Sequence, residues 1–175
     1  MKPKLFSLLL YTGVFILSVQ ICNAQGAFFS KIEPNSNQYF SNSADSNHLK
    51  SYVAYHLDEE GLRKYLLPAP LEFSNKQAKG IQLNVPLPNG QVEPFELYES
   101  PILSLEVAKN HPEIKTYAGK GVVHKNFNIR INFTSEGFSA IILGVNGDAV
   151  FFEQLNKNVK NQLYKSYFFK NAIPY

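Results

Sequence analysis

Residues 127–152 read FNIRINFTSEGFSAIILGVNGDAVFF, the clearest structural pattern within the segment Glu113–Phe152. The first eight residues alternate between large apolar and polar side chains. The apolar set is Phe127, Ile129, Ile131 and Phe133, and the polar set is Asn128, Arg130, Asn132 and Thr134. A period of two places each set on one face of a half-buried β-strand. We therefore expect Ile129 and Ile131 in the core and Arg130 on the opposite face.

Two turn signals divide the same stretch into three strands. Ser135-Glu136-Gly137 is expected to be a three-residue connection, whose glycine can take the left-handed conformation that such loops often need. The return strand, Phe138–Val145, leads to Asn146-Gly147, which is a strong hairpin signal. Ala149–Phe152 then crosses the sheet again. The stretch as a whole predicts an antiparallel meander.

The rest of the chain predicts further short strands and one or two short helices. Asp58 precedes two acids and an apolar helical spacing, which favours a helix that Pro68 ends. Pro86 confines the strand 78–87 to a sheet edge or a strand end. The other expected elements are strands at Tyr52–Leu57, Val92–Tyr98, Ile114–Tyr117 and Tyr164–Phe169, a helix from Ser104 to Ala108, and a bulge or turn at Gly119-Lys120-Gly121. The predicted fold class is mainly β (α+β), an antiparallel sheet with hairpins.

The N-terminus has the pattern of a secretory signal peptide. Lys2 and Lys4 precede an apolar run, Leu5–Ile21, and Ala24 supplies the small residue at a cut site. We expect cleavage between Ala24 and Gln25, so that residues 1–24 are removed. The resulting protein would be secreted, with no membrane segment of its own.

Two alternatives to cleavage are less consistent with the residues. The apolar run lies at or below the short limit of about 17–25 residues for a membrane-spanning helix, and it contains polar side chains. A lipid-modified Cys22 would require small residues before it, whereas Gln20 and Ile21 are bulky.

Removal of residues 1–24 takes away the only Cys and the only Met. It also lowers the formal net charge from +3 to +1, because 15 basic residues then face 14 acidic ones. The remainder has no thiol for a disulfide or a metal site, and no basic run that would favour nucleic acid. We expect residues 25–47, which are rich in Asn and Ser, to form a flexible lead-in, and residues 48–175 to form a single β-rich domain.

No pattern typical of catalysis or metal binding is found. The histidines are His48, His56, His111 and His124. None of them lie three or four residues apart, and no HExxH sequence is present, so we expect no zinc site, no catalytic residue and no cofactor. The acids of the central region are Glu96, Glu99, Glu106 and Glu113. They lack an apolar setting and are expected to be solvated surface acids.

Several segments in order carry a resemblance to a known family. They are Leu57-Asp58 with Leu62 and Leu66-Leu67, then Ala69–Phe73, Val85–Gly90, Phe95–Ile102, Pro112–Gly121, and Arg130 with Gly137–Ala140. Their order and spacing resemble the N-terminal domain of secreted bacterial reprolysin-like (metzincin) zinc metalloproteases, a propeptide-type region that precedes the catalytic domain. The resemblance spans Leu57–Phe169, and Tyr117-Ala118-Gly119-Lys120-Gly121 is its most specific part.

The chain departs from that family in two places. After Gly121 the family pattern has an acidic turn with a proline, whereas this chain has Val122–Asn126. The catalytic domain, with its HExxH helix and third histidine, does not follow Tyr175, so the resemblance carries over no metal ligand and no catalytic residue. It implies an orphan prodomain, a truncated gene product or a stand-alone descendant.

The resemblance implies a non-catalytic secreted module that assists the folding or latency of a zinc metalloprotease catalytic domain, in cis or in trans. Such a module can block a protease by adding an extended segment to the edge of its sheet. The alternative is a free-standing secreted β-domain that binds a protein or a glycan at the cell surface. Because no acid, base or nucleophile constellation is present, we expect no enzymatic activity.

Overall fold

The structure is a computed structural model, and it describes residues 28–33, 49–74, 78–155 and 162–172. The strands in this part are β1 (Phe29–Lys31), β2 (Val53–Leu57), β3 (Ile81–Pro86), β4 (Val92–Glu99), β5 (Lys115–Gly121), β6 (Asn128–Thr134), β7 (Gly137–Val145), β8 (Asp148–Gln154) and β9 (Leu163–Phe168). The helices are α1 (Glu59–Leu66), α2 (Leu105–Asn110) and the short 3-10 helix η2 (Phe169–Asn171). The predicted fold class, mainly β with short helices, is confirmed. The expected signal peptide and its Ala24–Gln25 cleavage site lie outside the described residues.

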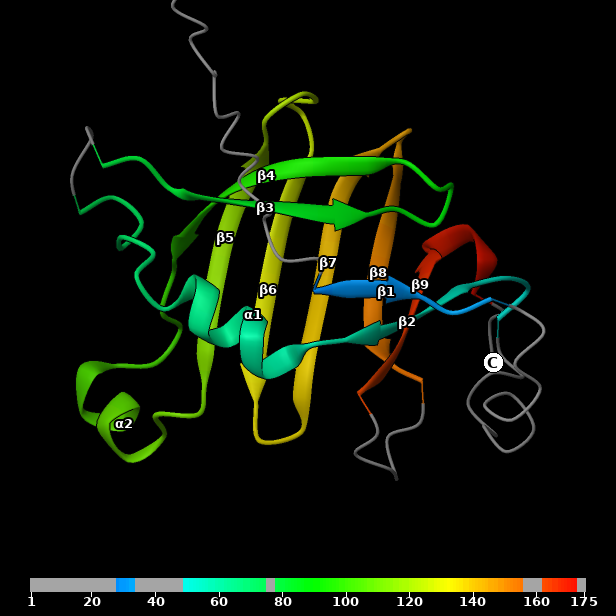
Figure 1. The fold of residues 1–175 in the computed structure, drawn as a ribbon. Helices are drawn as coiled ribbons and strands as arrows, with labels where there is room; N and C mark the ends of the chain where they lie inside the picture. Colours follow the sequence, from blue (N-terminus) through cyan, green and yellow to red (C-terminus); the bar gives the residue numbers. More distant parts are fainter. Residues whose placement is uncertain (1–27, 34–48, 75–77, 156–161, 173–175) are drawn as a thin grey trace, which may run out of the picture.

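All nine of these strands belong to one antiparallel sheet, in the order β1-β2-β9-β8-β7-β6-β5-β4-β3. The sheet is strongly curved. Strands β5 to β8 run upright in Figure 1, while β3 with β4 and β1 with β2 cross in front of them. The concave side encloses one core of apolar side chains contributed by every strand except the short β1, whose Phe29 packs against it. The sheet therefore nearly closes on itself around this core.

The meander is the centre of the sheet, and its predicted alternation is confirmed. Ile129, Ile131 and Phe133 are at most 2 % exposed, whereas Arg130 is exposed on the outer face. Asn146 and Gly147 both have positive φ, 53° and 78°, as the predicted two-residue hairpin turn requires. The three-residue loop expected between the first two strands is wrong. Thr134 pairs directly with Gly137, so only two residues form the turn and the glycine already belongs to β7.

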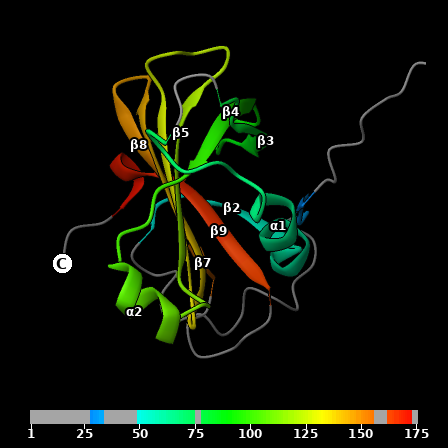
Figure 2. The ribbon, with the colours of Figure 1, turned by 90° about the vertical axis from the view of Figure 1, so that its left-hand side faces the viewer.

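Helix α1 covers the open side of the curved sheet. The Asp58 side chain caps it by accepting from the Gly61 amide at 2.9 Å, as predicted. Leu62 and Leu66 are completely buried in the core. The Tyr65 hydroxyl donates to the Gln82 carbonyl of β3 at 2.7 Å, so the helix links the β2 end of the sheet with the β3 edge. Figure 2 shows α1 well separated from α2, which lies at the lower end of β5.

Two expectations about local structure are wrong. Residues 25–47 were expected to be an irregular lead-in, yet Phe29–Lys31 forms a strand against β2, because Phe29 packs on the rings of Tyr55, Phe138 and Phe152. Residues 25–27 and 34–47 of the expected lead-in lie outside the described residues. The Gly119-Lys120-Gly121 segment is not a turn but the end of β5. Its glycines face the concave side, where a Cβ at Gly119 would lie 2.6 Å from the Leu97 side chain.

Proline placement follows the predictions. Pro86 ends β3, which is the edge strand of the sheet, so its missing N–H removes no ladder hydrogen bond from the sheet interior.

The Ser104 hydroxyl caps α2 by accepting from the Val107 amide, and the helix ends at His111 before a proline. Among the described residues, neither helix is long and apolar enough to cross a membrane.

Candidate functional site

The structure does not bring the histidines of the described segments together. His56 is an exposed residue of β2, His111 caps the C-terminal end of α2, and His124 lies in the turn after β5. His48 lies outside the described residues. Within the described segments, no group of three or more His, Cys, Asp or Glu side chains is placed to hold a metal ion.

The four acids differ in their surroundings. Glu106 and Glu113 are exposed, as expected. Glu99 is half-buried and pairs with the Lys115 ammonium at 2.5 Å, so its description as a solvated surface acid is wrong. Glu96 is also half-buried, and its Oε1 accepts from the Gly80 amide at 3.1 Å.

A buried acid, Glu93, was missed in the sequence. Its carboxylate accepts from the amides of Val123 and His124 at 3.1 and 2.9 Å and from His124 Nδ1 at 2.6 Å. Burial alone would raise the pKa of Glu93, but these hydrogen bonds outweigh it and hold the pKa below its ordinary value of 4.5. The signal that could have revealed it is its position in β4, where Glu93 shares the inward alternation of Phe95 and Leu97.

This arrangement has a structural role. The imidazole of His124 stacks on Phe127, with ring centroids 4.7 Å apart. A Cβ at Gly121 would lie 2.7 Å from the Glu93 carboxylate, so the glycine makes room for it. Glu93 thereby fixes the turn Val122–Asn126, the segment in which the chain departs from the metalloprotease-associated pattern.

A second polar cluster anchors α1 to the sheet. Glu59 pairs with Arg63 at 2.9 Å and accepts from the Tyr164 hydroxyl at 2.8 Å. Arg63 also donates to the Thr134 carbonyl, and its guanidinium lies 4.5 Å from the centre of the Phe133 ring. Burial, with the nearby Glu59 carboxylate, raises the pKa of Tyr164 to about 12. These groups satisfy one another, so the cluster stabilises the fold.

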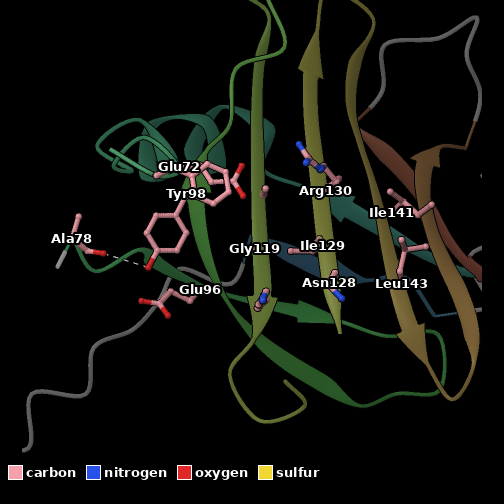
Figure 3. Close-up of a pocket in the computed structure, with 13 residues that line it drawn as sticks. Glu72, Ala78, Glu96, Tyr98, Gly119, Asn128, Ile129, Arg130, Ile141 and Leu143 are labelled. Carbon is pink, nitrogen blue, oxygen red and sulfur yellow. Dashed lines mark hydrogen bonds between the residues drawn. The ribbon is translucent and has the colours of Figure 1, made fainter. Parts of the chain in front are cut away.

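A groove of about 520 Å³ lies on the outer face of the sheet, and we call it the outer groove (Figure 3). It crosses β4, β5, β6 and β7 and is flanked by the segment that precedes β3. Its lining residues are Glu72, Phe73, Ala78, Glu96, Tyr98, Ala118, Gly119, Lys120, Asn128, Ile129, Arg130, Ile141 and Leu143. These residues are spread over 72 positions of the chain, so only the strand pairing assembles them.

The strand register sets the order in which acidic, aromatic, basic and aliphatic side chains occur across the outer groove. Across the strands, one row runs Glu96, Lys120, Asn128 and Leu143. The neighbouring row runs Tyr98, Ala118, Arg130 and Ile141. The β4 side is therefore acidic and aromatic, the middle is basic, and the β7 side is aliphatic. Figure 3 shows this order, with Tyr98 and Glu96 on one side and Ile141 and Leu143 on the other.

Among the described residues, the two cations in the middle of the outer groove, Lys120 and Arg130, form no salt bridge. Lys120 faces Glu96 across the strands, but that carboxylate is engaged by the Gly80 amide. Arg130 donates to the Ser100 hydroxyl at 3.1 Å. In the part of the chain that the structure describes, no carboxylate lies within 4.0 Å of either cation.

Phe73, at the rim of the outer groove, combines strain with exposure. It has φ +66°, a left-handed conformation that is uncommon for a bulky residue and costs about 1–3 kcal/mol. Its side chain is 95 % exposed, so no packing in the described structure compensates for that conformation.

A second exposed feature surrounds α2, which has no buried residue. Four large apolar side chains gather there, with exposed fractions of 49 % at Leu71, 68 % at Ile102, 86 % at Leu105 and 43 % at Val107. A crevice of about 260 Å³ runs between α2 and the ends of β4 and β5, and Leu71, Ile102 and Leu105 line it. We call these four side chains the α2 surface. It shares no lining residue with the outer groove.

Both features could contact a partner, the α2 surface through exposed apolar side chains and the outer groove through apolar and charged ones. No protein-family model matches the chain, and no curated protein and no solved structure is detectably similar to it.

Proposed function

We propose that this chain is a non-catalytic secreted module that binds a zinc metalloprotease catalytic domain and assists its folding or keeps it latent. The class of partner comes from the resemblance of Leu57–Phe169 to the N-terminal domain of reprolysin-like proteases. The observation that supports binding to another protein is the α2 surface.

Exposed apolar side chains gathered in one place favour association. Burying apolar surface contributes about 25 cal/mol for each Å² removed from water. Ile102 and Leu105 are more than two-thirds exposed and lie beside a crevice that a partner's side chain can fill. On small soluble domains, patches of this kind mark interaction sites. Association therefore recovers a hydrophobic stabilisation that the described fold leaves unused.

The amino-acid composition restricts how the module could keep the protease inactive. Cys22 is the only cysteine and belongs to the expected signal peptide, so a thiolate on the catalytic zinc is not part of the proposal. Steric cover of the active-site cleft, or a carboxylate placed on the metal, would serve instead. Glu106 lies exposed on α2 and is the carboxylate nearest in sequence to Leu105.

The test is titration of a secreted reprolysin-like catalytic domain with the protein expressed from the full chain, following hydrolysis of a fluorogenic peptide. We expect inhibition that saturates at one module per protease, together with a higher yield of active protease on refolding. The double variant Ile102→Ser/Leu105→Ser should lose both effects. Val123→Ser, at an apolar residue of similar exposure outside the α2 surface, is the matched control. The absence of a complex in size-exclusion chromatography would reject the proposal.

A second candidate is favoured by a different observation. The outer groove suits a free-standing secreted β-domain that binds a protein or a glycan at the cell surface. A module that binds through the outer groove but not through the α2 surface would support this candidate.

A further inference from the structure

We propose that the outer groove binds an extended peptide segment in which a carboxylate side chain stands between two apolar side chains. This inference concerns a surface that the proposed protease partner does not use, so it does not rest on that proposal. It follows from the charges, the exposed apolar groups and the strand spacing of the groove.

The carboxylate is required by the middle of the groove. Lys120 and Arg130 lie on adjacent strands, and both are exposed to the groove. The one acid that register places opposite Lys120, Glu96, is held by a backbone amide, and it lies on the β4 side together with Glu72. An anion is therefore attracted to β5 and β6 and repelled from β4.

Apolar side chains are required on both flanks. On the β7 side, Leu143 is 50 % exposed and Ile141 is its neighbour on the same face. On the β4 side, Tyr98 is half-buried, its hydroxyl donates to the Ala78 carbonyl at 3.3 Å, and Phe73 is exposed beside the groove. Bonding of its hydroxyl to the protein leaves the Tyr98 ring to offer apolar contact.

The spacing fits an extended chain lying across the strands. Adjacent strands are about 4.8 Å apart, so the line midway between β5 and β6 lies about 7 Å from β4 and about 7 Å from β7. Two residues of an extended chain span about 6.8 Å, and residues two apart point to the same side. An apolar residue at each of the positions two before and two after the acid therefore reaches a flank of the groove. Phe73, in its strained conformation, adds a wall on the β4 side.

The probe is the blocked heptapeptide Gly-Leu-Ser-Glu-Ser-Leu-Gly with a fluorescein label, and the matched probe replaces its Glu by Gln. Fluorescence anisotropy at low ionic strength measures the binding of each to the protein expressed from the full chain. We expect the Glu peptide to bind about tenfold more tightly, since hydrogen bonds to a charged group are markedly stronger than neutral ones. The preference should shrink at high salt, because these cations are exposed.

Variants locate the site. The double variant Lys120→Gln/Arg130→Gln should bind both peptides equally, and Leu143→Ser should weaken both. The control Lys50→Gln/Lys109→Gln removes the same charge from exposed positions outside the groove and should keep the preference. Thermal melts by circular dichroism verify that the variants are folded.

Equal affinity of the unaltered protein for the two peptides would overturn the proposal, and this comparison needs no variant. A preference that persists in the folded double variant would overturn it as well. Binding of chitotetraose without binding of either peptide would assign the groove to a glycan instead. None of these outcomes involves a protease, so this inference and the proposed function can fail separately.

Discussion

Glu93 offers the most direct test of the structure, because one side chain holds an entire turn. Replacement by Ala removes the acceptor of three hydrogen bonds, two from backbone amides and one from the His124 ring. A buried donor left without a partner costs about 1–3 kcal/mol. Val123 and His124 are exposed residues, so water reaches their amides and the lower end of that range applies. We expect the free energy of unfolding to fall by about 3 kcal/mol.

The assay is urea denaturation followed by far-ultraviolet circular dichroism and tyrosine fluorescence, since the chain has ten Tyr and no Trp. The control is Glu106→Ala on the exposed face of α2, where surface substitutions change stability by no more than about 0.5 kcal/mol. A cost below about 1 kcal/mol for Glu93→Ala would refute the claim that this carboxylate holds the turn.

The pH dependence of stability provides a second test of the role of Glu93. The pKa of Glu93 is lower in the folded protein than its ordinary value of 4.5, because hydrogen bonds to its ionised form outweigh the effect of burial. The stability it contributes is therefore complete above that ordinary value and is lost as the pH falls through the lower, folded value. The stability difference between the unaltered protein and Glu93→Gln should narrow on acidification below pH 4.5. A difference that widens would contradict the assignment.

Four further predictions follow from the same structure. Ile131→Ala should lower the free energy of unfolding by about 2–5 kcal/mol, and Arg130→Ala far less; equal costs would reverse the faces of β6. Because burial raises the pKa of Tyr164 to about 12, stability should fall between pH 10 and 12, and a Tyr164→Phe variant should show a shallower fall; identical slopes in alkaline denaturation would reject this. Mass spectrometry of the exported protein should find Gln25 at its N-terminus, whereas a lipid on Cys22 or a retained Met1 would refute cleavage after Ala24. Equilibrium dialysis should show no stoichiometric zinc binding, and a casein digestion assay should show no chelator-sensitive cleavage. Observing both zinc binding and such cleavage would overturn the proposal that the module is non-catalytic.

The two surface features make different demands on a partner. The α2 surface is apolar, so a partner must match it in shape, since hydrophobic association is not directional. The outer groove orders acidic, basic and aliphatic groups across four strands, so it selects by sequence. A variant in one feature should leave binding at the other unchanged, because they share no lining residue.

Local pattern alone was sufficient for the strands of the meander and its second turn, though not for its first turn, and for α1 and α2. The alternation around Ile129 and Ile131, the Asn146-Gly147 turn and the Asp58 cap each depend on residues within a few positions of one another. Periodicity and capping report such short-range requirements directly. Pro86 likewise confined its strand to a sheet edge or a strand end, because the missing N–H is a property of the residue itself.

Long-range pairing decided the rest. Phe29–Lys31 has no periodicity long enough to predict a strand, and it forms one because β2 and an aromatic cluster are there to receive it. Gly119 and Gly121 resemble a turn in sequence, yet they are strand residues kept small by Leu97 and Glu93 on the crowded concave side.

The two polar arrangements that matter most here were the hardest to predict from the sequence, because they join residues far apart in the chain. Glu93 and His124 are 31 positions apart, and the outer groove joins residues from Glu72 to Leu143. The sequence determined which side of each strand a residue occupies, since a period of two is a local property of the chain. Only the tertiary structure decided which strands are neighbours and in what register, and therefore which charges meet, because that choice depends on how the whole sheet curves around its core.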